Sequence, residues 1–158
     1  MTAERSGARH RSRAARHHSR RVALQALYAS DLHARGERPP ASPEACLEAV
    51  AEHFELAPGA RAFAKELVSG VAVHRAMLDE RLTAVARNWR LERMADVDRN
   101  LLRLAAFEML VLGTPPAVAI DEAVDLAHEF GDDGSPRFVN GVLDALAREA
   151  AGSPGAGA

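Results

Sequence analysis

The sequence has few of the residues on which secreted scaffolds and membrane proteins depend. It contains a single cysteine, Cys46, which excludes a disulfide framework and a cysteine-based metal cluster. No apolar run approaches the roughly 18 residues of a membrane span. We expect no secretory signal, because the first 20 residues hold no apolar segment. Aromatic residues make up 4% of the chain, so the core must be aliphatic. These absences favour a reducing compartment, and we expect the cytoplasm.

The motifs of common enzyme classes are also missing. The sequence has no GxGxxG, GxxxxGK[ST] or GxSxG pattern, and none of its seven histidines belongs to an HExxH pattern. Carboxylates such as Asp121 and Asp125 are four residues apart, a spacing that usually marks a solvated helix face. Cys46 beside an apolar stripe is interpreted as inert packing. We therefore expect no catalytic residue, no metal site and no cofactor.

Charge is distributed unevenly along the chain. Residues 1–21 carry seven arginines and one glutamate, a net charge of +6, whereas the remainder carries 13 basic and 21 acidic residues, a net charge of −8. A basic arm on an acidic body indicates a polyanionic partner for the arm, either nucleic acid or anionic lipid. Composition leaves two interpretations open: an arginine-rich RNA segment that becomes ordered on binding, or a non-specific basic tail. It does not separate RNA from DNA.

The apolar pattern predicts an all-α protein. A chain of 158 residues fits one domain, and composition predicts a disordered basic tail over residues 1–11, a helical domain over 12–150 and a disordered tail over 151–158. Apolar residues recur at spacings of three and four, without sustained alternation. Proline and glycine breaks predict six or seven helices in two packed bundles, joined through a long third helix over about 63–89. Gly70 in that helix predicts a kink or a close helix crossing. Phe63 and Trp89 are interpreted as core residues.

Several stretches resemble the NusB family, and they occur in the family's order. The resemblance covers roughly residues 16–149. It is carried by ALQALY at 23–28, Gly70-Val71 with His74 and Leu78-Asp79, VDRNLLRLAAFE at 97–108, PAVAIDEAVDLA at 116–127 and FVNGVLD at 138–144. It implies a fold of two helical bundles. It also implies a non-enzymatic antitermination factor that binds boxA-type single-stranded RNA together with the ribosomal protein NusE and helps RNA polymerase to read through terminators during ribosomal RNA synthesis.

The resemblance also implies which residues bind the partners. The RNA surface falls on the arginine-rich N-terminal segment and the start of the last helix, at Arg16, Arg20, Arg21, Gln25, Ser135, Arg137, Phe138 and Asn140. Arginine forks suit phosphates, a phenyl ring can stack on a splayed base, and an amide can pair with a base edge. The face for the basic protein NusE falls on Asp98, with Tyr28 and Glu108.

Structural interpretations remain open for three of these residues. Phe138 also suits core packing, Asn140 a cap or an interhelical hydrogen bond, and Asp98 a first-turn carboxylate that the helix dipole favours. The sequence departs from the family at His17-His18, where some members have consecutive basic residues, and at Gly134, where an acidic residue is frequent.

Two alternatives to the antitermination factor remain open. One is the NusB-like domain of a ribosomal RNA cytosine methyltransferase, which would require a separate domain with a glycine-rich cofactor loop and a catalytic cysteine. The other is a helical adaptor with an incidental basic tail. The sequence also leaves monomer and homodimer open.

Overall fold

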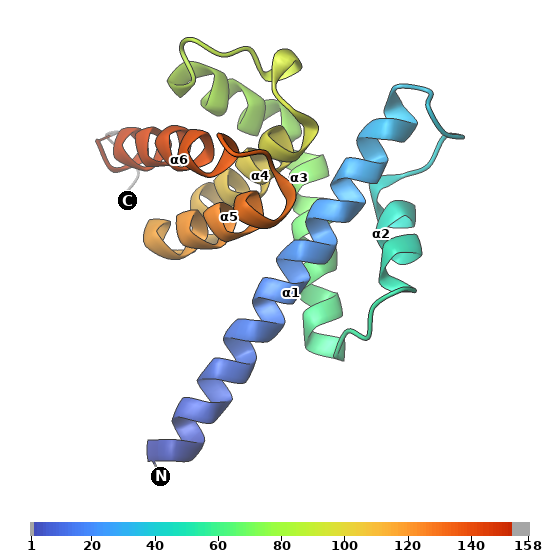
Figure 1. Ribbon diagram of the computed structural model, residues 1–158, viewed down its shortest axis with the longest axis vertical. Helices are drawn as coiled ribbons and strands as arrows, with labels where there is room; N and C mark the ends of the chain where they lie inside the picture. The colour runs from blue at the N-terminus through green and yellow to red at the C-terminus, as the bar shows by residue number, and fades with distance from the viewer. Residues whose placement is uncertain (1, 153–158) are drawn as a thin grey trace. The chain divides into compact units, whose positions relative to one another are not determined.

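The computed structural model describes residues 2–152, and helices make up most of this part of the chain (Figure 1). The α-helices are α1 (Thr2–Ala34), α2 (Pro43–Ala51), α3 (Pro58–Val85), α4 (Asp96–Phe107), α5 (Pro116–Phe130) and α6 (Ser135–Gly152). A short 3₁₀-helix, η1 (Leu91–Arg93), precedes α4, and a wider π-type turn, η2 (Glu108–Leu112), follows it. No strand occurs in residues 2–152, and the predicted all-α class is confirmed.

The helix ends follow local chemistry. Ser42 caps α2, because its side chain accepts a hydrogen bond from the Ala45 backbone N–H at 3.1 Å, and Pro43 occupies the first helical position. Further along the chain, η2 ends before Gly113, whose φ of 72° lies in the left-handed region that glycine adopts without strain. Caps and breakers therefore define these elements.

The chain divides into two compact units between Ser69 and Gly70. Helix α3 is continuous across this point, so its first half belongs to one unit and its second half to the other. The apolar pattern over about 63–89 fits one long helix or two collinear helices, and the structure has one, which ends at Val85 rather than near residue 89.

The first unit contains α1, α2 and the first half of α3. Helices α1 and α2 pack against each other, and the core is aliphatic as predicted. Its fully buried side chains include Val22, Leu24, Leu47, Leu67 and Val68. Cys46 is buried as well, and this burial raises the pKa of its thiol.

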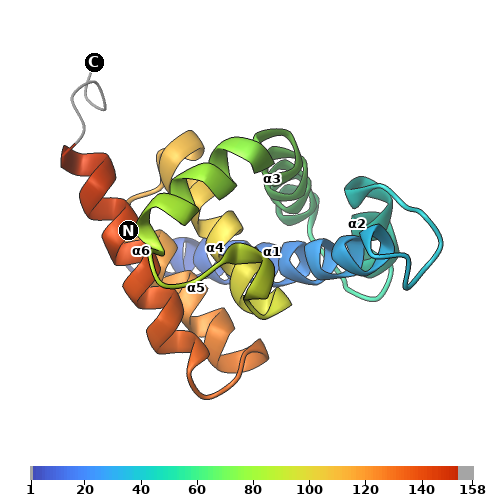
Figure 2. The same ribbon diagram turned by 90° about the horizontal axis from the view of Figure 1, so that it is seen from above.

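The second unit contains the rest of α3 and the helices α4, α5 and α6, of which the last three pack against one another (Figure 2). Every residue of α4 from Asn100 to Phe107 is buried. The guanidinium of Arg103 forms a two-pronged ion pair with Asp79 of α3, with Nε–Oδ1 and Nη2–Oδ2 distances of 2.7 and 2.9 Å. Helix α4 is therefore the central element of this unit.

The N-terminal segment differs from its predicted state. Composition predicts a disordered tail over residues 1–11, whereas α1 begins at Thr2. Alanine and arginine are both strong helix formers, so the segment extends the helix of the RRVALQAL region without a break. At the other terminus, the predicted tail over 151–158 lies outside the described residues beyond Gly152.

Candidate nucleic-acid interface

Two of the predicted RNA-binding arginines lie over one aromatic ring in the first unit. The guanidinium carbons of Arg16 and Arg20, one turn apart on α1, stand 5.1 and 5.5 Å from the ring centroid of Phe63 in α3. Both distances suit a cation–π contact. Arg16 is exposed, whereas Arg20 is only 4% exposed. Arg16 can therefore meet an external anion, and Arg20 mainly anchors α1.

Ser19 holds the same part of α1 in place. Its buried hydroxyl makes hydrogen bonds to the carbonyl oxygens of Ala60 and Ala15, at 2.8 and 2.9 Å. The ring of His18 meets Phe54 edge to face, with centroids 5.5 Å apart. These contacts fix the direction in which the neighbouring arginines project. The sequence does not reveal the contacts with Phe54 and Ala60, because these two residues lie about 40 positions away along the chain.

The remaining predicted residues of the first unit share a different stripe of α1. Arg21, Gln25 and Tyr28 are spaced by four and three residues, which places them on one helix face. Arg21 and Gln25 are half-buried, and Tyr28 is 39% exposed. A predicted RNA contact and a predicted NusE contact therefore lie next to each other on this stripe.

In the second unit, the other predicted RNA contacts occupy the first two turns of α6. Arg137 and Asn140 are exposed, Phe138 is half-buried and Ser135 is buried. Ser135 is engaged in a reciprocal cap: Asp132 Oδ1 accepts from the Gly134 and Ser135 backbone N–H groups, and the Ser135 hydroxyl accepts from the Asp132 N–H. Ser135 thus shapes the start of α6.

Asp98 lies beside this cap. It is 8% exposed in the first turn of α4, and its side chain is hydrogen-bonded to Ser135. Burial raises the pKa of Asp98, the Ser135 hydrogen bond opposes this shift, and the nearby charge of Asp132 adds to it. The Ser135 hydroxyl has one hydrogen to donate and two carboxylates in reach, since its Oγ also lies 3.1 Å from Asp132 Oδ1. Asp98 therefore connects α4 to the start of α6.

The third predicted NusE residue, Glu108, is buried in η2. Its carboxylate Oε1 lies 3.4 Å from the Thr114 hydroxyl, and its carbonyl oxygen accepts a hydrogen bond from the Thr114 N–H. Of the three predicted NusE residues, Tyr28 is the exposed one.

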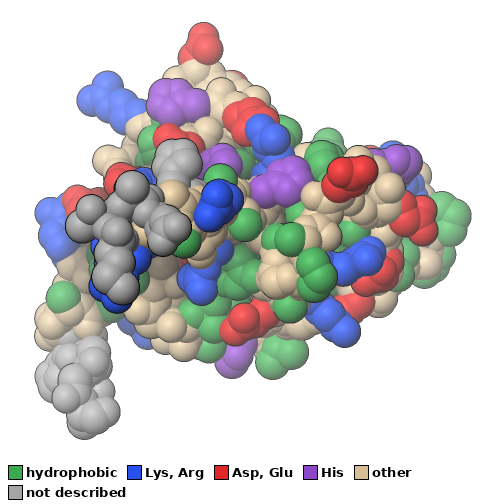
Figure 3. All heavy atoms as spheres, turned by 90° about the horizontal axis from the view of Figure 1, so that it is seen from below, with side chains coloured by type: hydrophobic (Ala, Val, Ile, Leu, Met, Phe, Trp, Pro, Cys, Tyr) green, Lys and Arg blue, Asp and Glu red, His purple; other side chains and the backbone are tan. Residues whose placement is uncertain are grey.

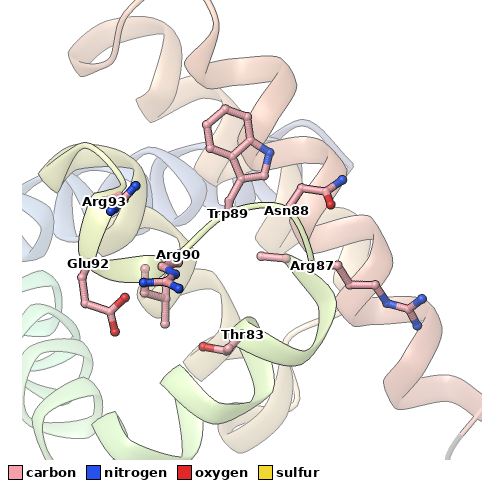
Figure 4. A pocket seen from close by; sticks show the side chains of 9 residues that line it. Thr83, Arg87, Asn88, Trp89, Arg90, Glu92 and Arg93 are labelled. Carbon is pink, nitrogen blue, oxygen red and sulfur yellow. The ribbon is translucent and has the colours of Figure 1, made fainter.

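Trp89 lies next to Phe138. The prediction that Trp89 is a core residue is wrong. Trp89 is 60% exposed, because α3 ends at Val85, before the helix could place residue 89 on its apolar stripe. The rings of Trp89 and Phe138 meet edge to face, with centroids 5.3 Å apart. Residues 83 and 86–93 line a hollow of about 610 Å³ at this position (Figure 4). The arginines around Trp89 in the stretch RNWRLER are the signal that could have identified this loop.

One face of the molecule is mixed in charge. On the face drawn in Figure 3, basic, acidic and histidine side chains are interspersed. Within residues 2–152, no cluster of three or more His, Cys, Asp or Glu side chains is placed to hold a metal ion. Every helix in the same range is too short or too polar to span a bilayer.

Comparison with known proteins identifies the family. The model of the NusB family matches residues 17–148. The transcription antitermination protein NusB of Anaeromyxobacter dehalogenans (strain 2CP-1) is 45% identical over 130 residues, which cover 82% of this chain and 87% of the relative. That of Geobacter sulfurreducens is 43% identical over 137 residues, covering 84% and 94%. The chain belongs to the NusB family.

Solved NusB structures have the same fold. Thermotoga maritima NusB is 31% identical, with a TM-score of 0.73 over 85% of this chain and 91% of that chain. A chain in the crystal structure of the antitermination factors NusB and NusE in complex with dsRNA is 30% identical, with a TM-score of 0.73 over 85% and 97%. The NusB family that the motifs indicate is confirmed. Because the named relatives are antitermination proteins, the comparisons favour that interpretation over the methyltransferase alternative.

The NusB match does not cover the whole candidate interface. The match includes the start of α6 and the part of α1 from residue 17 onward. Arg16 and the arginines before it lie outside the match. The prediction that Arg16 contacts RNA therefore depends on its exposure, its charge and its place over Phe63.

Proposed function

We propose that the protein is a cytoplasmic transcription antitermination factor that binds boxA-type single-stranded RNA together with NusE, as part of an RNA polymerase antitermination complex. The observation that carries the proposal is the start of α6, where Arg137 and Asn140 are exposed beside the half-buried Phe138 within the NusB match. The similarity to a chain of the NusB–NusE–dsRNA structure supports RNA and NusE as partners.

The chemistry of these side chains suits unpaired RNA. The guanidinium of Arg137 can pair with a phosphate, the amide of Asn140 can donate to and accept from a base edge, and the open part of the Phe138 ring can stack on a base. Ser135 contributes by capping α6 through Asp132, which fixes the direction of the first turn. On α1, Arg16 and Arg21 add positive charge, and Gln25 on the same stripe as Arg21 adds a neutral amide.

The three residues predicted to contact NusE differ in burial, which suggests that they have different roles at that interface. Tyr28 is exposed and can contact the partner directly. Asp98 is buried in the first turn of α4 and Glu108 directly after its last residue, and we propose that they support the contact surface from within.

Reconstitution with NusE and a boxA RNA tests the proposal. Arg137→Ala and Asn140→Ala should each weaken binding of a labelled boxA RNA to the chain–NusE complex, by about 1 kcal/mol or more for a lost charged or amide contact. Arg148→Ala is the matched control, because Arg148 is exposed on the same helix and paired with Asp144. If all three variants bind RNA alike, the start of α6 does not contact RNA.

The oligomeric state needs a separate measurement. Light scattering of the free chain distinguishes a monomer from a homodimer by mass, and repeating it after addition of boxA RNA shows whether RNA binding changes the assembly.

A further inference from the structure

The loop that carries Trp89 is a fixed element of the second unit. Ala86 and Leu91 on either side of Trp89 are buried, and the Trp89 backbone N–H donates a hydrogen bond to the Ala86 carbonyl at 3.1 Å. The indole nevertheless remains 60% exposed. The loop therefore presents a large aromatic surface to solvent from an anchored backbone, and Trp is typical of binding sites because its broad ring gives much contact area at low entropic cost.

The charge of this loop is opposite to that of the body. Residues 87–93 contain three arginines and one glutamate, a net charge of +2, within a body of net charge −8. Arg87, Arg90 and Arg93 are all exposed. Among the described residues none of the three guanidinium groups has an ion-pair partner, whereas the nearby Arg99 pairs with Asp96 at 2.5 Å. The loop thus holds three cations that an external anion can reach.

The loop lies next to the start of α6. In the close view, the Trp89 ring projects from one side of the loop, and the Arg87 and Arg90 side chains leave the same short loop in other directions (Figure 4). Trp89 contacts Phe138, one of the candidate RNA residues of α6, with 5.3 Å between ring centroids. A strand of RNA that meets Phe138 would therefore meet Trp89 next.

We propose that residues 87–93 form a second contact for single-stranded RNA, in which an unpaired base stacks on Trp89 and the arginines hold the flanking phosphates. This inference rests on the proposed RNA-binding function and extends its surface from α6 to the loop before η1. Stacking on an aromatic ring tolerates any base, so the loop should add affinity for all single strands and little discrimination. Its positive charge disfavours contact with a basic protein.

The single tryptophan of the chain makes the proposal measurable. The chain without NusE is titrated with a single-stranded RNA of about 12 nucleotides, within the size range of such sites, containing a boxA-type sequence or its scrambled version. Stacking should quench Trp89 fluorescence with the same midpoint as the anisotropy of a fluorescein-labelled copy. Trp89→Ala should weaken binding of both RNAs by roughly five- to 150-fold, the effect of one lost base stack. Trp89→Phe should restore most of the affinity.

Further variants separate the loop from the proposed function. Arg87→Ala with Arg90→Ala should lower the slope of log affinity on log salt by about 1.4, or 0.7 for each lost phosphate contact, whereas Arg148→Ala should leave it unchanged. If the wild type binds neither RNA, with or without NusE, the proposed function fails. If the wild type binds RNA without quenching and Trp89→Ala binds equally well, only the loop contact is wrong. A Trp89→Ala variant that keeps its RNA affinity but no longer binds NusE would likewise show that the loop does not bind RNA. It would identify the loop as a contact for NusE.

Discussion

A Cβ atom placed on Gly70 would come within 2.0 Å of Cζ of Phe107, so α3 and α4 approach each other at a residue without a side chain. Gly70→Ala should therefore destabilise the protein by about 1–3 kcal/mol, because the ring of a fully packed Phe107 must move. This cost should exceed the gain of up to about 1 kcal/mol that alanine brings to a helix interior. Urea unfolding followed by circular dichroism measures the difference.

Gly141 in α6 provides the matched control. A Cβ there would meet no atom within 4 Å, so Gly141→Ala should stabilise the protein by up to about 1 kcal/mol. If both glycine variants shift the urea midpoint in the same direction, steric contact with Phe107 does not decide the residue at position 70.

The ion pair of Arg103 and Asp79 should be far more sensitive to mutation than ion pairs at the surface. The side chain of Arg103 is 5% exposed, and Asp79→Ala would leave its charge buried without this partner. We expect a loss of about 3 kcal/mol in the free energy of unfolding. Asp144→Ala tests an exposed pair of similar length, Arg148 with Asp144 at 2.7 Å, and should cost less than about 0.5 kcal/mol. Equal losses in the two variants would show that burial is unimportant here.

Much of the helix pattern is predictable because its signals are local. Ser42-Pro43 and Gly113 define helix ends through backbone and side-chain hydrogen bonds within a few residues. Trp89 shows the limit of the same reasoning. Its spacing continues the apolar stripe of α3, but the helix ends at Val85, and periodicity contains no information on where a helix without a strong stop signal will end.

The candidate site is less predictable than the fold, because burial depends on contacts that are distant in sequence. Arg20 and Ser135 belong to basic or polar motifs that suggest surface contacts, yet both are buried. Arg20 is covered by packing with Phe63, 43 positions away, and Ser135 lies against Asp98 of another helix. Motif resemblance indicates candidate segments, but it cannot separate the side chains that reach solvent from those that hold the segment in place.

Asp98 should make stability depend on pH in a defined direction. Its pKa is raised in the fold, chiefly by burial, so the native state binds this proton more tightly than the unfolded state does. Stability should therefore fall as pH rises from the ordinary aspartate pKa of about 3.9 through the raised value. Asp98→Asn removes the ionising group, and it should be more stable than the wild type at pH 7, with a smaller difference near pH 4. Urea unfolding at both pH values measures this change.

Asp125→Asn on the exposed face of α5 serves as the control for Asp98→Asn. It should show no comparable change between the two pH values. A stability difference between Asp98→Asn and the wild type that stays constant with pH would show that the Asp98 carboxyl titrates alike in the folded and unfolded states.

The two arginines over Phe63 should separate RNA binding from stability. Arg16 is exposed, so Arg16→Ala should leave the urea midpoint nearly unchanged and lower the slope of log RNA affinity on log salt by about 0.7, the effect of one lost phosphate contact on a single strand. It should weaken boxA and scrambled RNA alike, because phosphate contacts carry no base information. Arg20 is buried, so Arg20→Ala should reduce stability first. Arg61→Ala is the control in the same unit, an exposed arginine paired with Glu48, and its salt slope should match the wild type. Should Arg16→Ala retain the full slope, or Arg61→Ala lose as much, the arm would not be the phosphate site.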